Sequence, residues 1–106
     1  LRKIEKAKES YKMAEAETLG SSDVKVVAKA AFNSRIATLL IEESKIVPGK
    51  INRATGEVEY GDIKEPAFDD LLDDIAELTL MRKGEVLVIP KDMMPSTTGV
   101  AAIFRY

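Results

Sequence analysis

The sequence predicts a layered α/β domain in which helices cover both faces of a β-sheet. Its 106 residues suffice for one core and fall short of two. Segments with apolar residues at helical spacing alternate with short runs that have apolar residues on both faces of a strand. Residues 36–41 and 86–89 are such runs, a pattern typical of strands buried on both faces. Helices that alternate with buried strands indicate the α/β class.

Two helices are expected before the first buried strand. Residues 1–19 contain no Gly or Pro and are expected to form the first helix. Gly20 suits the left-handed position that follows a helix. One face of this helix carries Leu1, Ile4, Ala7, Tyr11, Ala14 and Thr18. Ser21 to Asp23 offers an N-cap oxygen for a second helix, which is expected to stop at Asn33.

A hairpin, a third helix and two strands are expected in the second half. Val47 to Gly49 predicts a turn, and residues 50–60 predict a β-hairpin that must pack on the domain or on a partner. Glu65 and Pro66 suit the start of a helix that Gly84 ends. The apolar face of that helix is Phe68, Leu71, Leu72, Ile75, Leu78 and Met81. A loop over residues 90–98 and a last strand over residues 100–106 follow the strand at 86–89.

Composition excludes several classes of function. The sequence has no Cys and no His, which rules out disulfides, thiolate nucleophiles, Cys/His zinc sites and Ser-His-Asp triads. Sixteen basic and eighteen acidic residues give a net charge of -2, which is unlike a dedicated nucleic-acid binder. No apolar run approaches the roughly 18 residues of a membrane span. Because the chain opens on Leu1 rather than Met, we expect a fragment of a longer protein, without a signal peptide at this start.

Several segments resemble the C-terminal domain of the archaeo-eukaryotic peptide-chain release factor and pelota family. The last eight residues, Gly99 to Tyr106, are similar to the family's final strand, and Arg35 to Ile41 is similar to its central strand. Lys83 to Val86 stands where the family has a Gly-Gly-Glu-Val type of segment. Bacterial relatives of the family have segments similar to Val47–Ile51, Asp69–Asp74 and Met94–Gly99. The resemblance covers nearly the whole chain in the same order.

The resemblance implies a fold and a place of work. The fold would be the three-layer α/β/α sandwich around a mixed sheet that the family shares with ribosomal proteins that bind kink-turn RNA. The domain would be a non-catalytic, cytoplasmic platform that docks a translation factor, such as a GTPase, or the ribosome, without a cofactor or metal. The chain contains no Gly-Gly-Gln peptide-release motif. Its oligomeric state is not indicated.

The densest charged cluster is a candidate partner-binding surface. It comprises Asp69, Asp70, Asp73, Asp74 and Glu77. Acidic pairs on adjacent helical turns could hold Mg²⁺ or exchange protons, but acids in the first turns of a helix are more often explained by the helix dipole. We therefore favour a surface that faces a partner over a catalytic or metal site.

Two further groups of residues are candidates. Met93 and Met94 lie in the loop before the last strand, where they could contact a partner or fill a gap beneath the loop. A second hypothesis is direct binding of structured RNA at the start of the second helix. It involves Ser22, Lys25, Lys29 and Arg35. The three cations could contact phosphate, assisted by the backbone N–H of Ser22 at the start of the helix. A solvated helix face is the more common state of such residues. A contiguous positive patch would favour RNA, and an acidic surface would count against it.

Overall fold

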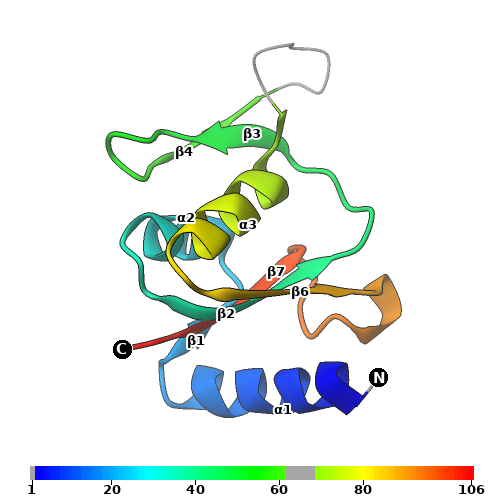
Figure 1. The fold of residues 1–106 in the computed structure, drawn as a ribbon. Helices are drawn as coiled ribbons and strands as arrows, with labels where there is room; N and C mark the ends of the chain where they lie inside the picture. The colour runs from blue at the N-terminus through cyan, green and yellow to red at the C-terminus, as the bar shows by residue number, and fades with distance from the viewer. Residues whose placement is uncertain (1, 62–68) are drawn as a thin grey trace.

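The computed structural model describes residues 2–61 and 69–106, and it confirms the α/β class (Figure 1). A four-stranded sheet has the order β1-β7-β2-β6, and a three-stranded sheet has the order β4-β3-β5. The helices are α1 (Arg2–Ala16), α2 (Val24–Phe32) and α3 (Leu71–Met81), with one 3-10 turn at Lys91–Met93. The strands are β1 (Gly20–Ser21), β2 (Ile36–Glu42), β3 (Pro48–Ile51), β4 (Val58–Tyr60), β5 (Asp69–Asp70), β6 (Glu85–Ile89) and β7 (Val100–Phe104).

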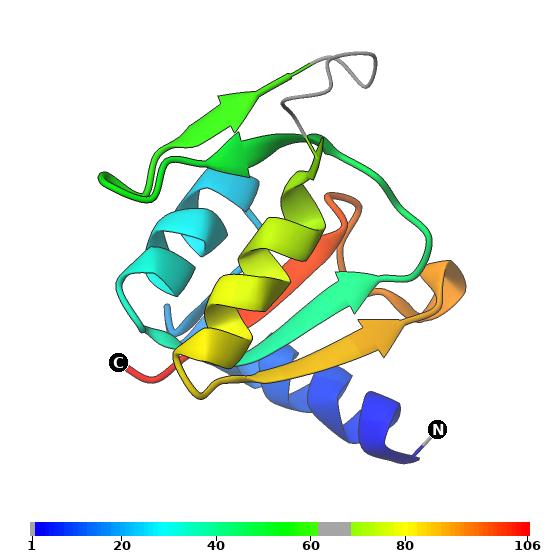
Figure 2. The same cartoon turned by 45° about the horizontal axis from the view of Figure 1, so that its top comes forward.

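The larger sheet is mixed and lies between helices. β2 pairs in parallel with β6 and antiparallel with β7, which in turn pairs antiparallel with β1. Figure 1 shows α1 below this sheet and α2 and α3 above it. In Figure 2 α2 and α3 lie side by side on their face, in agreement with their direct contacts. This arrangement is the three-layer sandwich that the resemblance implies.

Each face of the sheet has its own core. Leu39 of β2 and Val100 of β7 are fully buried against α2 and α3. Leu40 and Ala101 point to the other face, where the nearly buried ring of Tyr11 in α1 packs on them. Adjacent residues of β2 therefore serve opposite cores, as the doubly apolar run predicts.

The smaller sheet adds a layer outside α2 and α3. β3 and β4 form the predicted hairpin, which covers these helices on the side away from the larger sheet (Figure 1). Ile51 is buried and joins the core on the α2 and α3 side, and Val58 packs against it. The hairpin thus has the packing that two isolated strands need.

The helix ends differ from the prediction. Leu19 lies beyond α1, where the left-handed residue is Thr18 (φ 61°) instead of Gly20. Lys83 (φ 67°), not Gly84, takes this position after α3. The glycines meet a different need, because a Cβ on Gly84 would lie 2.7 Å from the carbonyl oxygen of Ile36. A Cβ on Gly20 would likewise lie 3.2 Å from the carbonyl oxygen of Ala102 in β7.

Other boundaries are also corrected. Pro48 and Gly49 belong to β3 rather than to a turn, since they pair with β5. Asp69 and Asp70 form β5, so α3 begins at Leu71 and not earlier. The expected helix start at Glu65 and Pro66, the apolar position Phe68 and the first residue Leu1 lie outside the described residues.

Two apolar positions expected in the core face solvent instead. Met81, at the end of α3, is 64% exposed. Val88 in β6 is 56% exposed, because β6 is an edge strand and not a strand covered on both faces. The last strand ends at Phe104, two residues before its predicted end.

Candidate interaction surfaces

The carboxylates of the acidic cluster divide between structure and surface. Asp70 is the N-cap of α3 and accepts from the backbone N–H of Leu72 at 3.1 Å and of Val47 at 2.9 Å. Asp74 accepts from the backbone N–H of Ile51 at 2.8 Å. Both carboxylates satisfy backbone donors of neighbouring segments, which stabilises the junction between α3 and β3.

Arg53 in the hairpin turn neutralises part of this cluster. Its guanidinium forms an ion pair and hydrogen bond with Asp74 and lies 3.5 Å from the carboxylate of Glu77. Among the described residues, no group of three or more acidic side chains is placed to hold a metal ion. The positive charge beside Asp74 and Glu77 is thus supplied by Arg53.

The acids that face solvent are Asp73 and Glu77. Both are exposed on α3, one turn apart. They line a hollow of about 320 Å³ together with Asp70 and Asp74. Asp69 is paired with Gly49 between β5 and β3, so it lies in the small sheet and not on the helix. The predicted acidic surface is therefore narrower than the sequence cluster.

The cations of the RNA hypothesis come together in space. Lys25, Lys29 and Arg35 line one hollow of about 360 Å³ between α2 and the hairpin, beside Gly56 and Glu57. The side chain of Glu57 is 71% exposed at this hollow, so its carboxylate opposes the three cations. The sequence could not show that the hairpin returns an acid to this place.

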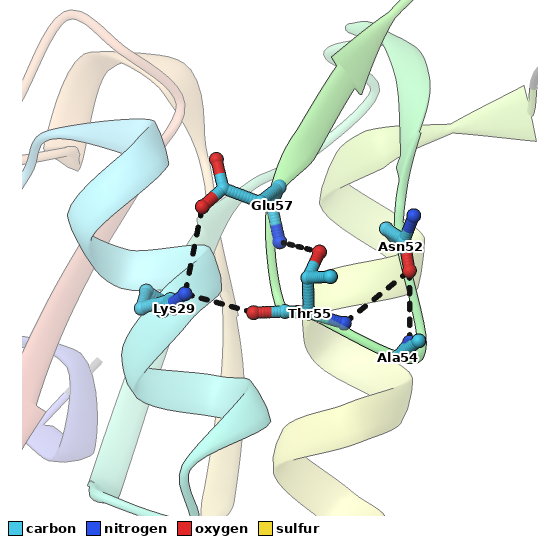
Figure 3. A network of polar contacts seen from close by, with 5 residues as sticks. All are labelled: Lys29, Asn52, Ala54, Thr55 and Glu57. Atoms are coloured by element: carbon cyan, nitrogen blue, oxygen red, sulfur yellow. Dashed lines mark hydrogen bonds and ion pairs between the residues drawn. The ribbon is translucent and has the colours of Figure 1, made fainter.

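Lys29 connects α2 to the hairpin turn (Figure 3). Its Nζ donates to the carbonyl oxygen of Thr55 at 2.8 Å and lies 3.6 Å from Glu57 Oε1. The turn is held by Asn52, whose Oδ1 accepts from the backbone N–H groups of Ala54 at 2.8 Å and Thr55 at 3.3 Å. Lys29 thus contributes to hairpin docking, whatever else it binds.

The other two cations lie over aromatic rings. Lys25 Nζ is 5.9 Å from the ring centre of Tyr60, and the guanidinium of Arg35 is 5.0 Å from that of Phe104. Arg35 also lies 5.5 Å from the ring centre of Tyr106 and donates to its backbone oxygen at 2.8 Å. Tyr60 and Tyr106 are exposed, and sequence reasoning missed them because their approach to these cations is set by tertiary structure.

Ser22 and the two methionines have structural partners. The carbonyl oxygen of Ser22 accepts from Thr98 Oγ1 at 2.6 Å, which ties the start of α2 to the loop before β7. Met93 and Met94 are half-buried and pack on the core between α1 and the sheet. They fill the space beneath their loop, which is one of the two roles weighed for them.

Tyr11 is the buried titratable group of the α1 side. Its hydroxyl donates to Glu15 Oε2 at 2.9 Å. Burial raises the pKa of Tyr11; a hydrogen bond with Ser22 opposes this rise, and the hydrogen bond and negative charge of Glu15 add to it. The ring belongs to the core, and sequence spacing placed it there correctly.

A further hollow involves residues that the sequence analysis did not select. It has a volume of about 460 Å³ and lies where β2 and β6 end, beside the start of α3. Ile46 and Val88 line it and are 59% and 56% exposed. The sequence gave no sign that these two side chains are exposed: Val88 lies within the apolar run 86–89, and only the strand order reveals that β6 is an edge strand.

Comparison with solved structures identifies a similar fold. The chain superposes on the C-terminal domain of a peptide chain release factor from Methanosarcina mazei with a TM-score of 0.69. The match covers 100% of this chain and 83% of that chain, at 18% sequence identity. The fold is that of a release-factor C-terminal domain. No protein-family model and no curated protein matches this chain.

Proposed function

We propose that this release-factor-like domain is a non-catalytic interaction domain that works in translation, in the cytoplasm, by docking a translation factor or the ribosome. The main support is that the whole of this chain superposes on a release-factor C-terminal domain. The resemblance of the final and central strands supports the same family. The translation factor we favour is a GTPase, as the family resemblance implies.

The surfaces suit a rigid platform. The sandwich fixes α3 and the hairpin relative to each other through Asp74 and Arg53. Asp73 and Glu77 then present two carboxylates, one turn apart, on a helix that is anchored on its other side. Charges held in place in this way attract a partner of opposite charge and fix its orientation. The platform then loses little conformational entropy on binding.

A catalytic role has little support from the side chains. The sequence has no His and no Cys. Four acids, Asp70, Asp73, Asp74 and Glu77, line one hollow. In that hollow Asp70 and Asp74 accept hydrogen bonds from backbone N–H groups, and Arg53 pairs with Asp74 and Glu77. An active site needs convergent groups that are available to react, so these commitments favour binding over catalysis.

Co-sedimentation tests the proposal. The chain is centrifuged with purified ribosomes, alone and with purified translational GTPases, at low and moderate salt. We expect it to enter the pellet with one of these partners. The double variant Asp73→Lys/Glu77→Lys should reduce the pelleted fraction severalfold. Glu5→Lys/Glu9→Lys makes the same charge change at the same spacing on exposed α1 positions, and it should pellet like the wild type. A chain that stays in the supernatant with every partner would contradict the proposal.

A specific observation favours RNA as a second candidate partner. The support for it is that Lys25, Lys29 and Arg35 line one hollow, in which Glu57 opposes their charge. We propose binding of structured RNA there as the alternative function. Fluorescence anisotropy with a labelled kink-turn hairpin should then show that Lys25→Ala/Lys29→Ala weakens binding and lowers the salt slope by about two. An unchanged slope would contradict this alternative.

A further inference from the structure

The hollow beside the edge strand combines apolar walls with an acidic rim. Its volume is about 460 Å³, and it lies between the ends of β2 and β6, the segment that follows β2, and the first turn of α3. The floor is formed by Ile41 and Leu72, which are nearly fully buried. The hollow therefore reaches side chains of the core.

Ile46 and Val88 form its apolar walls. They belong to different segments, and they are 59% and 56% exposed although both are branched aliphatic side chains. Single exposed aliphatic residues are common, but here two of them meet at one concave place over a buried apolar floor. A partner's aliphatic side chain placed between them would remove apolar surface of both proteins from water.

The charged rim determines the kind of partner. Glu42, Glu43 and Asp73 line the hollow, and none of them takes part in the ion pairs found among the described residues. Asp70 also lines it but is committed to the N-cap of α3. One cation, Lys45, opposes the acids, and its aliphatic stem lies close to Gly99. The rim is thus negative on balance.

We propose that this hollow binds a protein segment in which one branched or linear aliphatic side chain is flanked by Lys or Arg. The aliphatic side chain fills the space between Ile46 and Val88, and the flanking cations pair with Glu43 and Asp73. In its biological setting this inference rests on the docking function proposed above, since it gives that function a binding place and a partner chemistry.

Charge complementarity separates this occupant from two others. An RNA would bring phosphates to Glu42, Glu43 and Asp73, which repel it. A second copy of this chain would bring its own acidic rim to the same place if the two hollows faced each other. A basic, aliphatic segment meets both the apolar walls and the rim.

Methyl NMR of the isotopically labelled chain tests the inference. The probe is a synthetic peptide with one leucine between two pairs of arginines and with blocked ends. We expect saturable shifts of the Ile46 and Val88 methyl signals. A peptide with alanine in place of leucine should bind about five- to tenfold more weakly, and one with glutamates in place of the arginines should not shift these signals.

Variants of exposed residues separate the site from general charge effects. Glu43→Lys and Ile46→Ser should each weaken peptide binding about five- to tenfold, because one reverses a rim charge and the other removes a wall. Both positions are exposed, so the variants should fold like the wild type. Glu9→Lys changes the charge equally on the α1 side and should leave the affinity unchanged.

Four outcomes would overturn the inference. They are peptide-induced shifts confined to other residues, equal binding of the glutamate peptide, equal shifts caused by an oligouridine RNA, and concentration-dependent shifts without peptide. The last two would indicate RNA or a second copy as the occupant. If the chain pellets with a translation partner but the peptide does not shift these methyl signals, the docking function stands and this inference fails. If the peptide shifts these methyl signals but the chain pellets with no translation partner, the inference about the hollow stands and the docking function fails.

Discussion

The carboxylate of Asp74 in α3 accepts a hydrogen bond from the backbone N–H of Ile51 in β3, at 2.8 Å. The side chain of Asp74 is only 20% exposed, and it also pairs with Arg53 in the hairpin turn. This one side chain therefore connects α3 to both a strand and the turn of the hairpin. These contacts hold the outer hairpin layer, β3 and β4, against α3. It also removes Asp74 from the set of acids available to a partner.

We expect Asp74→Ala to lower the free energy of unfolding by about 2 kcal/mol, because the half-buried backbone donor of Ile51 loses its acceptor. Asp74→Asn should cost less, since the amide oxygen can still accept that bond. Urea denaturation measures both. Asp73→Ala is the control, because Asp73 is exposed and its loss should change stability by less than about 0.5 kcal/mol. Equal losses at the two positions would show that Asp74 does not anchor the hairpin.

The hairpin turn depends on Gly56, whose φ is +80°. A Cβ there would lie 2.7 Å from Phe32 Cδ2 in α2, so Gly56→Ala introduces both backbone strain and a clash. We expect a loss of about 1–3 kcal/mol in urea unfolding. Ala54→Gly, at an exposed position of the same turn, should cost under about 1 kcal/mol. A Gly56→Ala chain as stable as the wild type would contradict the close approach of the turn to α2.

Tyr11 predicts a loss of stability at alkaline pH. Burial raises its pKa above the ordinary value of about 10, so the folded chain keeps the phenolic proton at pH values where the unfolded chain has released it. The stabilisation is complete below about pH 10 and is lost as the pH rises through the folded-state pKa.

Urea unfolding at about pH 8 and about pH 11 should therefore show a smaller alkaline loss for Tyr11→Phe than for the wild type. Tyr60→Phe is the matched control, since the ring of Tyr60 is exposed, and it should follow the wild-type profile. A Tyr11→Phe profile that coincides with the wild-type profile would mean that the phenol does not contribute to the alkaline decline.

Local sequence patterns predicted most of the elements but fewer of their ends. Helical spacing placed Tyr11 in the core, and the doubly apolar run at 36–41 identified the central strand. Two-residue strands such as β1 carry no pattern of their own, because they exist through pairing with a distant strand. Asp69 and Asp70 fit the first turn of a helix as well as they fit β5, and only the pairing with β3 decides between them.

The candidate surfaces were harder to predict because they depend on tertiary approach. The sequence selected Lys25, Lys29 and Arg35, which do share a hollow, but it could not show that Glu57 joins them. The hollow of Ile46 and Val88 was missed altogether. An apolar residue in an edge strand has the same local pattern as one in a covered strand. Only the tertiary structure shows that Val88 is exposed while Ile89, beside it in β6, is buried.

The strand order itself gives the sharpest stability prediction. Leu40 in β2 and Leu87 in β6 are register partners and pack in the same core, between α1 and the larger sheet. Leu40 is fully buried, whereas Leu87 is only partly buried. Leu40→Ala should cost about 2–5 kcal/mol because β2 lies between two strands and the cavity cannot collapse toward solvent. Leu87→Ala removes the same atoms from an edge strand and should cost about half as much in the same urea titration. Equal losses of stability in the two variants would contradict the edge position of β6. A β6 covered like β2 would also leave the hollow lined by Val88 without an open side for a partner to enter.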